Sequence, residues 1–228
     1  LENLALVPGT VGGAAVQNIG AYGLEAAERI TKVECLDART LEPCVLDVDE
    51  CDYGYRSSIF KSEQCADLIV VSVVLELPKV FEPRIAYKEL AAVFADAKPQ
   101  TPMEVAQAVK SIRRKKLPDP AELPNAGSFF KNPVVTRIKQ RHLLEDMPQL
   151  VSYPLAGGRA KLAAGWLIDA VGMKGKRAGD AAVYDRQALV LVNYGNATGE
   201  QIKALADEVA GKVRLRFGVK LEPEPVII

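Results

Sequence analysis

Four short segments of this chain carry the residue types and spacing that chemistry requires. The first, VPGTVGGAAVQNIGAYG at 7–23, is rich in glycine, and main chain without Cβ atoms can approach and bind a phosphate or a cofactor edge. The other three are YGYRSSIF at 53–60, NAGSFFKNP at 125–133 and LEPEP at 221–225. Three of the segments also have an ordinary explanation, which is a turn or close strand crossing for the first, a surface ion pair for the second and a charged tail for the last.

Arg56 and Ser128 are the candidate reactive residues in these segments. In a desolvated site an arginine is a fixed, bidentate partner for a carboxylate or a phosphate. Ser128 lies in a predicted turn of small residues without the GxSxG pattern of a serine hydrolase, and the only histidine, His142, lies in a charged helical stretch. The glycine-rich segment contains neither Gly-Lys-Ser/Thr nor GxGxxG after a strand, which excludes a P-loop NTPase.

Charge and composition are those of an ordinary globular protein. The 29 basic residues balance 29 acidic ones, so no chain-wide basic field attracts nucleic acid. The longest apolar run, 68–75, is far shorter than the ~20 residues that a membrane span requires, and no basic-then-apolar leader opens the chain. The four cysteines have no CxxC spacing. We therefore expect a soluble cytoplasmic protein with reduced cysteines, no metal site, and neither nucleic-acid nor membrane partners.

Hydrophobic patterns predict a sheet followed by a helix in the first half of the chain. The runs Ile30–Asp37 and Cys44–Val48 are β-rich and joined by a hairpin loop, and Leu68–Leu77 is predicted as a strand of the same sheet, buried on both faces. A capping box with proline at the first helical position predicts a helix over Pro102–Lys116. The two prolines that follow mark the predicted domain boundary. No strand or helix is expected before the glycine-rich segment.

The second half is predicted to be a compact α/β unit. The stretches Val134–Leu144 and Lys161–Val171 have helical character, and Ala188–Asn193 has the character of a strand. The capping box Thr198–Gln201 opens a further helix with one apolar face, which ends at Gly218.

Seven segments carry a family resemblance when they are read together and in order. They are Pro8–Gly13 with Gln17–Gly23, Tyr55–Lys61, Lys116–Pro118, Asn125–Pro133, Leu167–Asp169, Gln187–Asn193 and Leu221–Glu224. This set, which spans essentially the whole chain, closely resembles the UDP-N-acetylenolpyruvoylglucosamine reductase family, called MurB. The resemblance implies an α+β fold in which the C-terminal part of a PCMH-type FAD-binding domain precedes an α/β substrate-binding domain.

The resemblance also implies a bacterial, NADPH-dependent flavoenzyme of peptidoglycan synthesis. FAD would take hydride from NADPH and pass it to UDP-N-acetyl-3-O-(1-carboxyvinyl)-glucosamine, which gives UDP-N-acetylmuramate. The implied partners are this UDP-sugar and NADPH, and the implied oligomeric state is a monomer. Hydride addition to an alkene that carries a carboxylate requires a positive partner for the developing negative charge, followed by a proton for the adjacent carbon.

The family's catalytic roles carry over by motif. Arg56 would hold the substrate carboxylate and stabilise the enolate-like intermediate, and Glu224 would assist from the same side. Ser128 would be the proton donor, a role that an alcohol can fill because the carbanionic intermediate is a strong base and neighbouring polar groups can support the alkoxide. Tyr87 resembles an aromatic residue on a loop that closes over the substrate, and the alternative is a tyrosine that begins a short helix. The other implied substrate contacts are Lys116, Lys131, Asn132 and Gln187, and the implied FAD contacts are Pro8, Gly9, Gly12, Gly13, Gln17, Asn18, Gly20, Ala21, Tyr22, Gly23 and Val70.

The predicted domains are an FAD-binding portion over 1–116, a substrate-binding domain over 117–218 and a tail over 219–228 that returns to the active site. Because the family has a further glycine-rich turn before this region, we expect part of the FAD-binding domain to precede Leu1. Pro225 and the stretch Tyr184–Arg186 depart from the family pattern. Two alternatives stay open, namely an inactive fragment that binds the UDP-sugar without FAD, and another FAD-linked oxidoreductase of the same fold.

Overall fold

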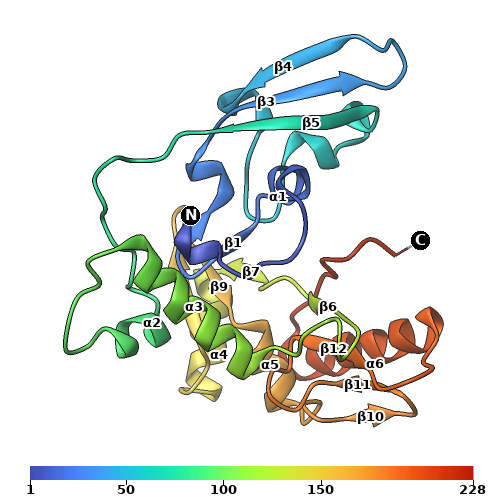
Figure 1. Cartoon of the computed structure of the whole chain (residues 1–228). Coiled ribbons are helices and arrows are strands. Elements are labelled where there is room, and N and C mark those ends of the chain that lie inside the picture. Colours follow the sequence, from blue (N-terminus) through green and yellow to red (C-terminus); the bar gives the residue numbers. More distant parts are fainter. Residues whose placement is uncertain (228) are drawn as a thin grey trace. The chain divides into compact units, whose positions relative to one another are not determined.

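The computed structural model describes residues 1–227 and divides into two compact units, Leu1–Lys115 (unit 1) and Lys116–Ile228 (unit 2) (Figure 1). The division falls at the end of helix α3, Pro102–Lys116, whose predicted bounds are confirmed. Pro118 and Pro120 follow directly and cannot continue the helix. Among the described residues, no helix is long and apolar enough to cross a membrane.

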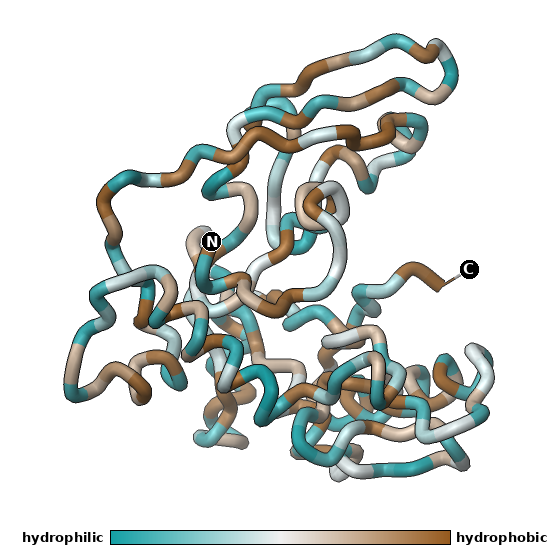
Figure 2. The backbone as a smooth tube through the Cα atoms, viewed as in Figure 1, coloured by the Kyte–Doolittle hydropathy of each residue, from teal (hydrophilic) through white to brown (hydrophobic). Residues whose placement is uncertain are grey.

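Unit 1 contains the predicted antiparallel sheet, in the order β4-β3-β5. Its strands are β3 (Ile30–Asp37), β4 (Pro43–Asp47) and β5 (Leu68–Leu75). The expectation that the third strand is buried on both faces is wrong, because Ile69 and Val71 are 54% and 67% exposed. The run of apolar residues along β5 is visible in Figure 2. It reflects the apolar composition of an outer strand, and one of its faces is largely open.

The glycine-rich segment contains a helix that the sequence analysis did not predict. Helix α1 (Val11–Gln17) begins after Thr10, whose hydroxyl oxygen accepts a hydrogen bond from Gly13 N at 3.0 Å. A Cβ atom at Gly12 would lie 3.6 Å from Val70 Cγ1, so α1 packs closely on β5 through its small residues. A 3₁₀ turn at Glu2–Leu4 also precedes the segment, where we expected no helix.

A short hairpin follows α1 and forms the centre of unit 1's polar contacts. Its strands are β1 (Gly20–Ala21) and β2 (Leu24–Glu25), joined by Tyr22 and Gly23 at φ values of 49° and 85°. A separate small core lies between α2 (Lys88–Val93) and α3, where Leu90, Val105 and Val109 are fully buried. Further 3₁₀ turns lie at Ala26–Glu28, Val48–Cys51, Ile59–Lys61 and Glu63–Cys65.

Over residues 116–227, unit 2 contains two small antiparallel sheets and three helices, with a large apolar core and a second, smaller apolar cluster around Ala182, Val190 and Val192. The first sheet has the order β10-β11-β12-β6 and the second the order β7-β9-β8. The strands are β6 (Asn125–Ser128), β7 (Val134–Thr136), β8 (Ser152–Leu155), β9 (Arg159–Leu162), β10 (Arg177–Ala178), β11 (Ala181–Val183) and β12 (Val190–Asn193), and the helices are α4 (Arg137–Asp146), α5 (Ala164–Ala170) and α6 (Gly199–Phe217).

Four predictions in unit 2 need correction. The stretches predicted as helices at 134–144 and 161–171 begin as strands β7 and β9, which pair with each other before α4 and α5 start. Thr136 marks the change, because its hydroxyl oxygen accepts from Lys139 N at 3.2 Å and caps α4. Ser128 ends a strand and does not lie in a turn, and the strand predicted from Ala188 begins at Val190.

Helix α6 confirms the prediction made from its capping box. The Thr198 hydroxyl oxygen accepts from Gln201 N, and the Gln201 side chain accepts from Thr198 N. Gly218 ends the helix at φ 60°, a left-handed conformation that glycine adopts at little cost. The predicted apolar face is buried in the core of unit 2.

Candidate active site

Arg56 lies in a strained loop of unit 1 and is held by main-chain carbonyls. Its φ of 54° is in the left-handed region, which non-glycine residues adopt at a cost and which is often found at functional sites. The guanidinium donates from Nη2 to Gly20 O at 2.7 Å and from Nη1 to Asn18 O at 3.5 Å. Its carbon lies 5.1 Å from the centre of the Tyr55 ring. The glycine-rich segment thus orients this side chain.

Two further contacts join the Arg56 loop to the end of α1. Lys61 Nζ donates to Gln17 Oε1 at 2.6 Å and to Arg56 O at 3.2 Å. The hydroxyl of Ser58, which is 5% exposed, donates to Val16 O at 2.6 Å. Gln17, a predicted FAD contact, therefore has a partner within the protein.

The glycines of the segment serve different purposes. A Cβ atom at Gly20 would lie 2.9 Å from Glu25 Cγ and 3.0 Å from Arg56 Nη1, so this protein's own side chains occupy the space beside it. Contacts within the protein thus account for the absence of a Cβ atom at Gly20. Gly9 and Gly23, at φ 116° and 85°, have nothing within 4 Å of such an atom, so their main chain faces open space.

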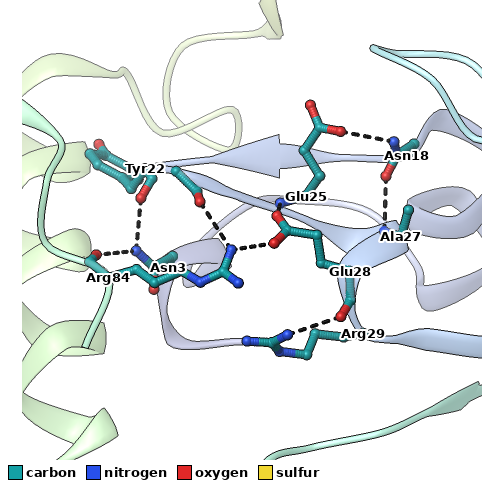
Figure 3. A network of polar contacts seen from close by, with 9 residues as sticks. Asn3, Asn18, Tyr22, Glu25, Ala27, Glu28, Arg29 and Arg84 are labelled. Atoms are coloured by element: carbon teal, nitrogen blue, oxygen red, sulfur yellow. Dashed lines mark hydrogen bonds and ion pairs between the residues drawn. The ribbon is translucent and has the colours of Figure 1, made fainter. Parts of the chain in front are cut away.

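The segment that carries Tyr87 is fastened to the β1–β2 hairpin by three residues, Asn3, Glu28 and Arg84, which we call the Arg84 clasp. Asn3 Nδ2 donates to Tyr22 O and to Arg84 O, both at 2.8 Å, and the Arg84 guanidinium forms an ion pair with Glu28 (Figure 3). Tyr87 itself precedes α2 and packs edge-on against Tyr22, with ring centres 5.0 Å apart.

Electrostatics in the clasp favour the charged carboxylate. Partial burial opposes ionisation of Glu28, but the Glu25 N–H and the Arg84 guanidinium both donate to it and lower its pKa below the ordinary value. Burial raises the pKa of the Tyr22 hydroxyl, which therefore stays protonated at neutral pH. Glu28 and Arg84 thus form a charged pair at neutral pH.

In unit 2 the C-terminal tail pairs with the chain beside Ser128. Glu224 N donates to Phe129 O at 2.8 Å, and Lys131 N donates to Glu222 O at 2.9 Å. Phe130 and Pro223 form the antiparallel bridge between these two bonds. We call this arrangement the tail pairing. It fixes the main chain of Glu224 against the residue that follows Ser128, although the two are far apart in sequence.

Buried apolar residues anchor both sides of the tail pairing. Val219 and Leu221 are each 3% exposed, and Phe130 is 2% exposed. Phe129 N also donates to Leu189 O at 2.7 Å, which joins the segment to the loop before β12. Lys131 Nζ lies 3.9 Å from Glu222 Oε2.

The other predicted substrate contacts of unit 2 are spread over separate elements. Asn132 Oδ1 accepts from Ala164 N at 2.9 Å, at the first residue of α5, so its side chain also stabilises the fold. Gln187 lies in the turn before β12, where its Oε1 accepts from Leu189 N at 3.4 Å. Lys116 is the last residue of α3.

Sequence reasoning missed Asn3, Glu25, Glu28 and Arg84. The spacing of Glu25 and Glu28 did carry a signal, because together they form a capping box around the 3₁₀ turn Ala26–Glu28. Asn3 and Arg84 are 81 positions apart and belong to no local pattern. Only the folded chain brings them together.

Comparisons with known proteins agree in naming one family. Residues 119–228 match the family model "UDP-N-acetylenolpyruvoylglucosamine reductase, C-terminal domain". Relatives of the name UDP-N-acetylenolpyruvoylglucosamine reductase include proteins of Chromobacterium violaceum, at 54% identity, and of Paraburkholderia xenovorans, at 52%. All of this chain is covered in both cases, together with 68% and 67% of the relatives, so it spans about two thirds of their length.

A solved structure gives a similar result. The crystal structure of UDP-N-acetylenolpyruvylglucosamine reductase (MurB) from Thermus caldophilus superposes with a TM-score of 0.62 and 25% sequence identity. The match covers 98% of this chain and 62% of that one. The likeness therefore extends over both units of the mixed α/β chain.

Proposed function

Because the chain belongs to the UDP-N-acetylenolpyruvoylglucosamine reductase family, we propose that it forms the larger part of an enzyme that reduces UDP-N-acetyl-3-O-(1-carboxyvinyl)-glucosamine to UDP-N-acetylmuramate. FAD would be its cofactor, NADPH its co-substrate and peptidoglycan synthesis its process. Unit 1 would supply part of a PCMH-type FAD-binding domain, unit 2 would bind the substrate, and the tail from 219 would return to the active site. We infer a monomer in the bacterial cytoplasm.

The residues of unit 1 fit a flavin cofactor in part. The Cβ positions of Gly9 and Gly23 face open space, and Pro8, Ala21 and Tyr22 lie beside these two glycines, so a bound group could approach the main chain there. Gly12, Gly13 and Val70, by contrast, make contacts within α1 and β5. When bound, FAD supplies the hydride that NADPH has delivered to it.

Arg56 would bind the carboxylate of the enolpyruvyl group. As hydride adds to one carbon of the double bond, negative charge develops on the adjacent carbon and spreads into the carboxylate. A guanidinium that is already oriented by the carbonyls of Gly20 and Asn18 stabilises this charge without first having to reorganise. Arg56 therefore lowers the barrier to hydride addition.

Ser128 would donate its hydroxyl proton to that adjacent carbon, and Glu224 would act beside it. The observation that carries this part of the proposal is the tail pairing, in which Glu224 N binds Phe129 O at 2.8 Å. It brings a carboxylate-bearing residue to the end of β6, where Ser128 lies. The proton from Ser128 would complete the addition across the double bond and leave a serine alkoxide, which neighbouring polar groups would have to support.

The remaining residues would bind the UDP-sugar or cover it. Lys116 and Lys131 provide positive charge for its phosphates and carboxylate, whereas Asn132 and Gln187 provide polar groups. Tyr87, held next to Tyr22 by the Arg84 clasp, would cover the site and exclude water during hydride transfer.

A flavin spectrum tests whether the chain is sufficient for this function. The 228-residue protein is incubated with FAD, freed of excess cofactor, and its absorbance is recorded before and after NADPH and the enolpyruvyl sugar are added in turn. We expect bound flavin that NADPH bleaches and the sugar restores. Ser128→Ala should leave bleaching unchanged and slow the restoration by at least ~100-fold, the low end of a general acid's contribution. Ser111→Ala, an exposed serine on α3, is the matched control.

The alternatives give different results in the same experiment. A chain without bound flavin that still binds the UDP-sugar in calorimetry would be a fragment that lacks its cofactor. A flavin that oxygen restores and the sugar does not would indicate another oxidoreductase of the same fold. Equal slowing of both half-reactions by Ser128→Ala would rule out the proton-donor role.

A further inference from the structure

We propose that Asn18 is a positioning residue for Arg56 and that its side chain acts inside the protein, not as a direct contact to the cofactor. The role of Arg56 toward a substrate carboxylate rests on the proposed function. The positioning of Arg56 by Asn18 depends on the geometry of unit 1 alone.

The side chain of Asn18 is buried and its hydrogen-bonding groups have partners within unit 1. The residue is 1% exposed. Its Nδ2 donates to Glu25 Oε2 at 3.1 Å, and its Oδ1 accepts from Ala27 N at 3.0 Å (Figure 3). Its Nδ2 also donates to Gly54 O at 2.9 Å. A primary amide has two N–H donors, and both have an acceptor here. Asn18 therefore joins the hairpin to the loop that leads into Arg56.

The main chain of Asn18 takes part in the same arrangement. Its φ of 45° ends α1 in the left-handed conformation, which asparagine tolerates better than most residues. After this turn, the carbonyls of Asn18 and Gly20 both accept from the Arg56 guanidinium. The side chain of Asn18 thus holds the loop at Gly54, and its main-chain carbonyl helps to orient the Arg56 guanidinium.

Gly20 further restricts the position of the Arg56 guanidinium. Because a Cβ atom there would lie 3.0 Å from Arg56 Nη1 and 2.9 Å from Glu25 Cγ, the arginine packs directly against bare main chain. Carbonyl oxygens that accept from a guanidinium orient it without neutralising its charge. The main chain of Asn18 and Gly20 therefore fixes the orientation of the Arg56 guanidinium.

Chemical modification of Arg56 in the 228-residue chain tests the proposal without cofactor or substrate. Phenylglyoxal labels arginines, and mass spectrometry gives the rate for each. Asn18→Gly keeps the left-handed backbone and removes the amide, and Asn18→Asp keeps the size but replaces both donors. We expect labelling of Arg56 to be about tenfold faster in both, as for the loss of one charge-assisted hydrogen bond. Arg39, whose side chain is 68% exposed, should label at an unchanged rate.

The matched control is Leu41→Gly, the same kind of change at another left-handed residue, with φ 61° and 71% exposure. It should leave the labelling of Arg56 unchanged. If Asn18→Gly does not fold, Asn18→Asp alone carries the test, because it keeps the size of the side chain and removes the donors to Glu25 and Gly54.

Each outcome decides the question. An unchanged Arg56 rate in folded variants overturns the proposal, as does equal acceleration at Arg39 and Arg56, which would mean general loosening. Faster labelling at Arg56 alone supports it. If the same variants then reduce the enolpyruvyl sugar at the normal rate, the positioning holds and the role of Arg56 in the proposed function fails.

Discussion

The two units hold their candidate catalytic residues by different means. In unit 1, hydrogen bonds from named polar atoms orient the side chain of Arg56, and the segment with Tyr87 depends on the Arg84 clasp. In unit 2, main-chain bonds hold the tail beside Ser128, and buried apolar residues anchor it. Unit 1 should therefore be sensitive to the loss of single polar atoms, and unit 2 to the loss of apolar volume.

Each unit carries its own intrinsic probe for this comparison. The only tryptophan, Trp166, packs near Phe217 in the core of unit 2, with ring centres 6.1 Å apart. All four cysteines are free and belong to unit 1, where Cys35 and Cys51 are buried. Tryptophan fluorescence therefore follows the unfolding of unit 2, and thiol labelling follows that of unit 1.

The largest effect is expected from the apolar anchor of the tail. Leu221→Ala removes a side chain that is 3% exposed and should lower the free energy of unfolding of unit 2 by about 3 kcal/mol, as for other buried leucines. Urea titration followed by Trp166 fluorescence measures it. Leu215→Ala, on α6 at 89% exposure, is the matched control and should change stability by less than about 0.5 kcal/mol. Equal losses in the two variants would contradict the apolar anchor.

The second-largest effect is expected from removing the buried polar side chain of Asn3 in unit 1. Asn3 is fully buried, and Asn3→Ala would leave the carbonyls of Tyr22 and Arg84 without their donor, at a cost of about 2 kcal/mol to unit 1. We expect faster labelling of Cys51 and faster tryptic cleavage after Lys79 and Arg84. Asn196→Ala, an exposed asparagine of unit 2, should change neither rate. Unchanged cleavage in Asn3→Ala would mean that the clasp does not hold this segment.

Alkaline pH should lower the stability of unit 1 more than that of unit 2, by less than the two substitutions above. Burial raises the pKa of the Cys35 thiol to about 11, whereas an unfolded cysteine titrates near ~8.5. Because the folded state keeps the proton more tightly, the stabilisation is complete below ~8.5 and is lost as pH rises from there toward about 11.

Urea unfolding between pH 8.5 and 10, followed both by circular dichroism and by Trp166 fluorescence, measures this loss. We expect unit 1 to lose stability while the tryptophan signal of unit 2 shifts less. Cys35→Ala should flatten the pH dependence, and Cys65→Ala, at a partly exposed position, should not. A parallel pH dependence of both units would contradict the assignment to Cys35.

How well the sequence predicted the structure depends on the range of the interactions involved. Local signals sufficed for α3 and α6, where capping boxes and end signals fixed the ends of the helices. They failed at β7 and β9, because short strands gain their stability from pairing with each other across 23–27 positions. The exposed face of β5 was missed for a similar reason, since an apolar run does not tell which face is covered.

The candidate site likewise contains residues that local sequence motifs identified and contacts that only the structure revealed. Motifs led to Arg56, Ser128 and Glu224, but not to the tail pairing or to the residues that hold Arg56. Gly20 shows why. The glycine in the sequence indicates that another group packs close to the main chain, but only the structure identifies the side chains of Arg56 and Glu25 as that group. Glycine content can indicate a close contact with the main chain, but the residue that makes the contact is known only from the folded structure.

The smallest expected effect tests whether charge matters in the clasp, beyond its hydrogen bonds. Glu28→Gln keeps an oxygen that can accept from Glu25 N but removes the ion pair with Arg84. Because the two side chains are 38% and 40% exposed, we expect a loss of only about 0.5 kcal/mol. The lowered pKa of Glu28 means that this contribution is present above ~4.3 and disappears as pH falls through the folded value.

A double-mutant cycle with Arg84→Gln, followed by thiol labelling in low and in 1 M salt, isolates the coupling. The coupling should vanish in high salt and at low pH in unit 1. Asp207→Asn, which breaks the exposed Lys203–Asp207 pair of α6, should leave unit 1 unchanged. A coupling that survives 1 M salt would mean that the geometry of Asn3, and not the charge pair, carries the clasp, which would make unit 1 dependent on neutral hydrogen bonds at both ends of its hairpin.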